Sequence, residues 1–135
     1  MANLPTQPTS RLRAFLNSFG YAFAGLWHVV KTQRNMRVHL CAAAAAVALG
    51  IYVGLDRTQW AVLALTIGLV LVAEMFNTVA EAAMDATMPR YHPLVRIAKD
   101  VAAGAVLITA LISVAVGTLT LGPPLWNKVA SWFGH

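Results

Sequence analysis

The stretch TQWAVLALTIGLVLVAEMFNTVAEAAMD, residues 58–85, decides the fold, because it joins a long apolar run to a regularly spaced set of polar residues. Residues 58–73 contain no Asp, Glu, Lys or Arg, and the apolar character continues past Glu74 to Ala80. About 20 apolar residues in a helix cross the hydrocarbon core of a bilayer. We therefore expect a transmembrane helix over residues 59–80.

Two further apolar runs flank this stretch. Residues 38–55 and 101–127 also contain no Asp, Glu, Lys or Arg, and they predict spans over 38–56 and 99–121. We expect a tight turn at 56–58 between the first two spans and a polar loop over 83–97 between the last two. Pro123 and Pro124 should stop the third span, because proline disrupts a helix.

The composition also indicates a membrane protein of one domain. Of the 135 residues, 59% are hydrophobic and only 11% are charged, with a mean hydropathy of +0.64, whereas about 25% of an average soluble domain is charged. The net charge of +5 would suit nucleic acid, but the basic residues flank the apolar runs and form no stripe. Cys41 is the only cysteine, which excludes an intrachain disulfide. We expect one domain over 1–135 and no nucleic-acid partner.

The segment before the first span has the pattern of an amphipathic helix. After a short tail, 1–8, that we expect to be disordered, apolar side chains share an arc of about 120° at 100° per residue. They are Phe15, Leu16, Phe19, Phe23, Leu26, Trp27 and Val30. We expect a helix over 9–36 that lies in the membrane interface, the alternative being a helix packed on the bundle. A secretory signal is not expected, because no continuous apolar core lies in the first 30 residues.

The positions of the basic residues predict the orientation. Eight of the ten lie before the first span or around the polar loop, namely Arg11, Arg13, Lys31, Arg34, Arg37, Arg90, Arg96 and Lys99. Only Arg57 and Lys128 fall on the opposite side. The positive-inside rule then places the N-terminus and the polar loop in the cytoplasm and the C-terminus outside. Trp60, Trp126 and Trp132 would lie at the outer interface.

The acidic residues gather at one end of the second span. Four of the five Asp and Glu residues fall within 74–100. On a helix, Glu74, Asn77, Glu81 and Asp85 share a face of about 80°. At about 1.5 Å per residue, Glu74 lies about 22 Å into a core of about 30 Å, and Glu81 lies near its inner boundary. The pattern places one carboxylate inside the membrane and a second at water.

An ionisable residue inside a span indicates a functional site, the alternative being a glutamate that snorkels or hydrogen-bonds a neighbouring helix. A buried carboxylate can accept a proton from a lipid hydroxyl, and one at the interface can hold a divalent cation. Lys99 can offer positive charge to a phosphoryl group in transfer. The sequence contains no Walker A motif, kinase glycine-rich loop or H-E-x-x-H. His28, His39 and His92 are more readily explained by packing or interface positions than as ligands.

The chain resembles the bacterial membrane diacylglycerol kinase and undecaprenol kinase family. The resemblance covers about residues 15–115 and is carried by the pattern E-x-x-N-[ST]-x-x-E-x-x-x-D over 74–85 and the Lys99-Asp100 pair, with supporting matches at 20–26, 34–39 and 91–93. It implies a bacterial inner-membrane lipid kinase, all-α, with an interfacial helix and three transmembrane helices. It also implies a homotrimer with sites shared between protomers; the small residues Ala98, Ala102 and Ala105 would permit such close packing.

The resemblance also implies roles for individual residues. ATP and Mg²⁺ would be used, and the lipid would be diacylglycerol or undecaprenol, with 35–39 and 92–100 more like the undecaprenol branch. Glu74 would be the catalytic base, Asn77 would position substrate or phosphate, and Lys99 would contact phosphates. The cofactor site would comprise Glu81, which holds Mg²⁺ and ATP, together with Asp85, Asp100 and the matching Gly25.

One position departs from the family pattern. Many members have a glutamate two residues before Asn35, at the metal site, where this chain has Gln33. Either Mg²⁺ is held with fewer charges, or the chain is a degenerate kinase that serves as a membrane scaffold or lipid-binding protein. A transporter or proton-relay subunit is less favoured, because the interiors of the first and third spans contain no Asp, Glu, Lys or Arg.

Overall fold

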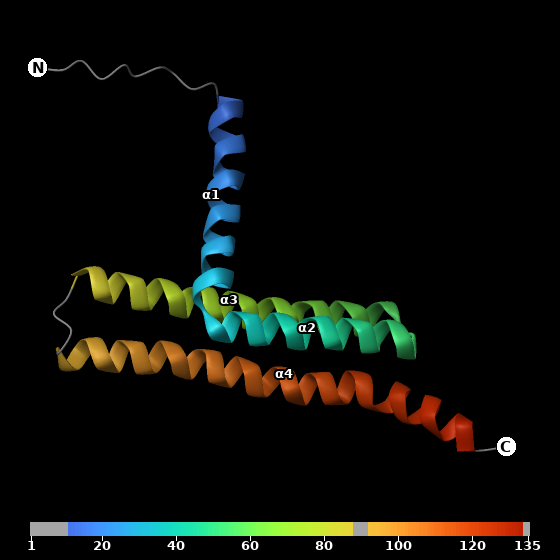
Figure 1. Cartoon of the computed structure of the whole chain (residues 1–135). Coiled ribbons are helices and arrows are strands. Elements are labelled where there is room, and N and C mark those ends of the chain that lie inside the picture. Colours follow the sequence, from blue (N-terminus) through green and yellow to red (C-terminus); the bar gives the residue numbers. More distant parts are fainter. Residues whose placement is uncertain (1–10, 88–91, 134–135) are drawn as a thin grey trace, which may run out of the picture.

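The computed structural model describes residues 11–87 and 92–133, and these form four helices. They are α1 (Arg11–Thr32), α2 (Arg34–Val53), α3 (Arg57–Thr87) and α4 (Pro93–Phe133). Helices α2, α3 and α4 run side by side as a bundle, and α1 projects sideways from it (Figure 1). The predicted all-α class is confirmed, and α2, α3 and α4 are each long and apolar enough to cross a membrane.

The helices around the polar loop extend further than predicted. The loop expected over 83–97 is wrong at both ends, since α3 continues to Thr87 and α4 already begins at Pro93. Residues 88–91 lie outside the described part of the chain, as does the tail 1–8. Proline is suited to the first position of a helix, where no intrahelical donor is needed. The His92 Nδ1 atom accepts a hydrogen bond from the Leu94 N–H at 3.2 Å, which satisfies one of the free donors at the start of α4.

The prediction that Pro123 and Pro124 end the third long helix is also wrong. Helix α4 runs through both prolines to Phe133 and bends towards its C-terminal end (Figure 1), as expected where two consecutive residues lack an N–H donor. Lys128 holds the last turns against the end of α2, because its Nζ donates to the Tyr52 carbonyl and lies 4.5 Å from the centre of the Tyr52 ring. This contact fixes the helical residues that follow the prolines against α2.

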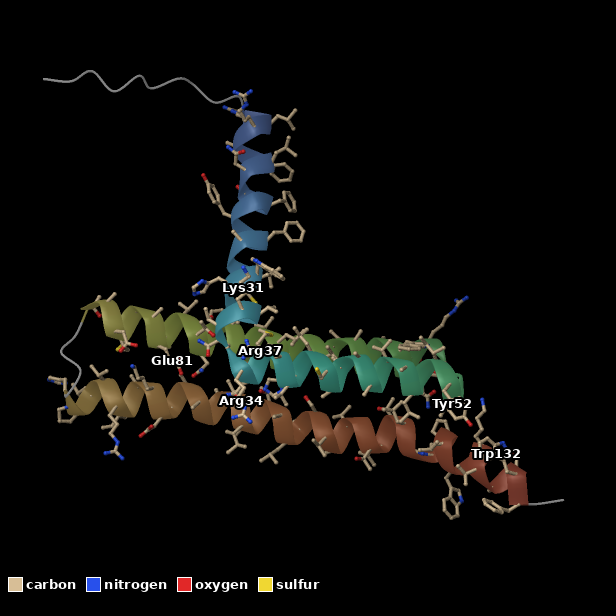
Figure 2. All side chains as sticks on the ribbon, in the orientation of Figure 1. Lys31, Arg34, Arg37, Tyr52, Glu81 and Trp132 are labelled. Carbon is tan, nitrogen blue, oxygen red and sulfur yellow. The ribbon has the colours of Figure 1, made fainter. Side chains whose placement is uncertain are left out.

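The helix predicted over 9–36 is interrupted at Gln33. This residue has extended backbone angles of φ −95° and ψ 118° and separates α1 from α2. Arg37 closes the joint from the other side, since its Nη1 atom donates to the carbonyls of Val30 (3.3 Å) and Lys31 (2.8 Å) at the end of α1. Most aromatic rings of α1 lie on the side towards which α2 runs (Figure 2). The interfacial position of α1 stays a prediction.

The first two spans are joined by a tight turn as predicted, but it lies at 54–56 and not at 56–58, because α3 already begins at Arg57. Gly54 adopts the left-handed conformation, φ 79°, and its N–H donates to the Gly50 carbonyl at 3.0 Å. Asp56 and Gln59 then cap α3 reciprocally: the Asp56 Oδ1 atom accepts from the Gln59 N–H, and the Gln59 Oε1 atom accepts from the Asp56 N–H. This pair is the capping-box arrangement that starts many helices.

The packed core lies at this end of the bundle. Leu55, Leu63 and Leu121 form its buried centre, whereas most large apolar side chains of the three long helices are exposed on the single chain. Such an outer surface suits lipid, which can cover apolar side chains at no cost. The homotrimer stays a prediction.

We predict that Gly54→Ala lowers the free energy of unfolding by about 1–2 kcal/mol, because an L side chain is strained in the left-handed region. Thermal unfolding of the protein in detergent micelles would measure the change. Gly20→Ala is the matched control, since Gly20 lies in α1 with no atom within 4 Å of the added Cβ. Equal stability of the Gly54→Ala variant and wild type would contradict the prediction.

Candidate functional site

Helices α2, α3 and α4 enclose a polar cavity of about 300 Å³. Three of the four polar residues predicted to share a face of α3 line it, namely Glu74, Asn77 and Glu81. The remaining lining residues are Asn35, Val38 and His39 from α2 and Ala103, Val106, Leu107 and Ala110 from α4. The continuation of α3 to Thr87 keeps the predicted face unbroken as far as Asp85.

Glu74 is the most deeply buried residue of the cavity. Its side chain is 1% exposed, and neither carboxylate oxygen has a hydrogen-bond partner among the described residues. His39 and Glu81 are close enough to act on it electrostatically. An unpaired carboxylate in an apolar interior is costly, so a group kept in this state is available to a ligand that enters the cavity.

Asn77 lies on the same face of α3 as Glu74 and hydrogen-bonds the second carboxylate, Glu81. Its Nδ2 atom donates to Glu81 Oε1 at 3.1 Å, while its Oδ1 atom is buried with no partner in the described part of the chain. Glu81 is half-buried and lies at the side of α3 that faces α4 (Figure 2). The cavity therefore presents three unpartnered acceptor atoms near one more exposed carboxylate.

Lys99 and Asp85 bridge the two helices beyond the cavity. The Lys99 Nζ atom lies 2.6 Å from Asp85 Oδ1, about one helical turn past Glu81. Asp100 points elsewhere: it pairs with Arg96 at 3.8 Å, and both side chains are largely exposed. The structure thus brings Lys99 and Asp85 together and leaves Asp100 on the outer surface of α4.

Besides Asp85, Lys99 and Asp100, two further predicted site residues do not line the cavity. Gly25 is exposed on α1, with open space around its Cα. Gln33 is half-buried at the joint between α1 and α2, and its side chain makes no capping hydrogen bond. Their roles at the cofactor and metal sites stay predictions, as do those of the other site residues.

Asn35 and His39 line the cavity although neither was predicted to be functional. They lie four residues apart, hence on one face of α2, at the point where the apolar run begins. This spacing is the signal that could have identified them. The conclusion that His39 is more readily a packing residue missed its place beside Glu74.

The acidic residues of the site are better suited to a cation that enters bound to phosphate oxygens of a ligand than to a metal ion whose ligands all come from the protein. Among residues 11–87 and 92–133, no group of three or more His, Cys, Asp or Glu is placed to hold a metal ion. Mg²⁺ commonly takes one or two carboxylates and completes its shell with water and phosphate oxygens. The half-buried carboxylate of Glu81 with the unpartnered Oδ1 of Asn77 fits that description.

Comparison with known proteins agrees with this geometry. The family model for prokaryotic diacylglycerol kinase matches residues 20–121, a range that contains every residue of the cavity. A diacylglycerol kinase of Synechocystis sp. is 45% identical over 111 residues, which are 82% of this chain and 63% of that protein. The chain thus spans less than two thirds of that relative.

Two further relatives are covered almost completely. An undecaprenol kinase of Bacillus subtilis is 38% identical over 116 residues, which are 86% of this chain and 94% of that protein. A diacylglycerol kinase of Escherichia coli is 26% identical over 113 residues, 84% of this chain and 93% of that protein. The two substrates named among these relatives are both lipid alcohols.

We predict a coupling free energy of about 0.2–1 kcal/mol between Asp85 and Lys99, the range for a partly exposed ion pair. A double-mutant cycle with Asp85→Asn and Lys99→Gln, read as free energy of unfolding in micelles, would measure it. The matched cycle of Asp100→Asn with Lys99→Gln should show no coupling, because Asp100 pairs with Arg96. Equal coupling in both cycles would show that the pairing is wrong.

Proposed function

This chain belongs to the prokaryotic diacylglycerol kinase family, and on that premise we propose that it is a membrane lipid kinase. It transfers the γ-phosphoryl group of ATP to the hydroxyl of diacylglycerol or undecaprenol at the cytoplasmic face. The observation that carries the proposal is Glu74, a carboxylate at 1% exposure with no partner for either oxygen, lining a cavity with a second carboxylate.

Glu74 is the general base of the proposed reaction. It accepts the proton of the lipid hydroxyl while the hydroxyl oxygen forms a bond to the γ-phosphorus, and the bond between that phosphorus and the β,γ-bridging oxygen breaks to release ADP. Burial of the carboxylate keeps bulk water away from the reacting oxygen. This favours transfer to the lipid over hydrolysis of ATP.

The polar residues beyond Glu74 bind the nucleotide. Glu81, with the buried Asn77 beside it, would hold the Mg²⁺ that accompanies ATP, and the cation would screen the charge of the phosphates. Lys99 moves from Asp85 to the phosphates and stabilises the charge that develops in transfer. Asp85 supports that lysine, and Asp100 and Gly25 contribute to the nucleotide site from α4 and α1.

The charge distribution supports an orientation for this reaction. In the sequence, eight of the ten basic residues come before the first span or around the loop between the last two spans. The candidate site lies at these same ends of the spans. The positive-inside rule assigns this side to the cytoplasm, where ATP is. The protein is then a multi-pass inner-membrane protein with its C-terminus outside. Helix α1 lies in the interface, and three copies assemble into a homotrimer.

A catalytically degenerate scaffold or lipid-binding protein of the same fold is the second candidate. The observation that favours it is Gln33, which lacks the negative charge of the glutamate expected there and does not line the cavity. A lipid-binding scaffold would bind the lipid without producing a phosphorylated product.

We predict that Glu74→Gln and Glu81→Gln each abolish transfer of labelled phosphate from ATP to lipid in mixed micelles with Mg²⁺. The first removes the proton acceptor and the second a cation ligand. Asp56→Asn is the matched control, since it also removes one carboxylate but keeps a good helix N-cap at the far end of α3. If the wild-type protein forms no more lipid product than a variant with both Glu74→Gln and Glu81→Gln, the kinase proposal is wrong and the scaffold is the remaining candidate.

We predict that Gln33→Glu lowers the Mg²⁺ concentration needed for half-maximal activity, because a carboxylate binds the cation more strongly than an amide. The measurement is the rate of lipid phosphorylation against Mg²⁺ concentration at saturating ATP and lipid. Gln7→Glu in the N-terminal tail adds the same charge elsewhere and serves as the control. An unchanged Mg²⁺ requirement in Gln33→Glu would exclude Gln33 from the metal site.

A further inference from the structure

A second, apolar cavity of about 300 Å³ adjoins the polar one. It lies between the same three helices, and His39 and Ala110 line both cavities. Its other lining residues are Ala42, Ala43, Ala46, Leu63, Thr66, Ile67, Val70, Leu71, Ser113, Val114 and Gly117. On α3 the lining runs from Leu63 towards Glu74, a distance of about 16 Å along the helix.

The polar side chains of the apolar cavity offer few donors to a ligand. The Thr66 hydroxyl donates to the Val62 carbonyl, and the Ser113 hydroxyl donates to the Thr109 carbonyl, each at 2.7 Å. All the lining residues are described by the structure. Among them, His39 is the residue whose side chain can still donate a hydrogen bond to a ligand, through a ring nitrogen. The cavity therefore suits a plain hydrocarbon better than glyceryl esters, whose carbonyls would meet no donor along it.

The shape of the cavity suits one chain. His39, Ala42, Ala43 and Ala46 share an arc of about 100° on α2, so three of the four side chains on this wall are methyl groups and leave space beside α3 and α4. A volume of 300 Å³ corresponds to about ten water-sized groups at about 30 Å³ each. This space is enough for one hydrocarbon chain.

We propose that the apolar cavity binds the hydrocarbon chain of a lipid alcohol that has one chain and no ester, a polyprenol, and that His39 hydrogen-bonds its hydroxyl beside Glu74. The chain lies along the alanine wall of α2, and the hydroxyl passes from the apolar into the polar cavity at the level of the His39 ring. This assignment rests on the proposed function and narrows its two lipids to one.

Photo-crosslinking tests the binding without turnover. The full-length protein in lipid nanodiscs is irradiated with a polyprenol that carries a diazirine within its chain, and labelled peptides are mapped by mass spectrometry. We expect label on α2, α3 and α4 at cavity residues, displaced by unlabelled polyprenol and at least tenfold less well by dioleoylglycerol. Label confined to the outer surface, or equal displacement by both lipids, would overturn the proposal.

Cavity-filling variants test the chain site. Ala46→Leu fills the apolar cavity, whereas Ala44→Leu adds the same side chain at an exposed position that does not line it. We expect Ala46→Leu to weaken labelling by the diazirine polyprenol and to raise its KM by about tenfold or more, as for a group that no longer fits an apolar pocket. KM for ATP stays within twofold. Equal effects of the two substitutions would refute the chain site.

Two substitutions of His39 test the hydroxyl contact. His39→Phe keeps a ring but removes the hydrogen bond, and His39→Gln keeps a donor and an acceptor. We expect kcat/KM for polyprenol to fall about tenfold in the first, the usual effect of one hydrogen bond, and less than threefold in the second. Equal activity of the two variants would exclude the contact. Normal labelling in a wild-type protein without kinase activity would instead count against the proposed function alone.

Discussion

The structure depends on one constraint, the burial of the Glu74 carboxylate among apolar helices. A charged group in such surroundings is costly unless it is paired, yet both of its oxygens lack partners among the described residues. The helices that surround it pack with their core at the opposite end of the bundle, around Leu63 and Leu121. The packed core and the candidate site are therefore separated along the length of α3, and the end that carries the polar face holds the unpaired group.

Much of this arrangement follows from the sequence. Long apolar runs predict the three long helices, and the 3.6-residue period places Glu74, Asn77 and Glu81 on one face without knowledge of their neighbours. The helix ends follow less well, because they depend on contacts between distant residues. Helix α4 continues past two prolines to the Lys128 contact with Tyr52, and the Arg37 contacts with the end of α1 accompany the break at Gln33.

The site shows the same division. Lys99 and Asp100 are adjacent in the sequence and were grouped together, but neighbouring helical residues point about 100° apart, and only Lys99 reaches α3. The spacing of Asn35 and His39 indicates a shared face of α2, but the position of His39 at the meeting of two cavities depends on how α2 packs against α3 and α4. The alanines at 42, 43 and 46 can be assigned to the wall of a cavity only when the packing of α2 against α3 and α4 is known.

The two prolines of α4 also indicate where the helix would leave the hydrocarbon layer of the membrane. Because they lack N–H groups, the carbonyls of Leu119 and Thr120 lose their helical donors, and such carbonyls are tolerated where water or headgroups can reach them. About 20 residues of helix, the thickness of the hydrocarbon layer, lead back from Leu119 to Lys99. The same count along the antiparallel α3, started at Trp60, ends beside Glu81. On the predicted spans, two helices that run in opposite directions would thus reach the same water boundary, with Glu74 two turns beneath it.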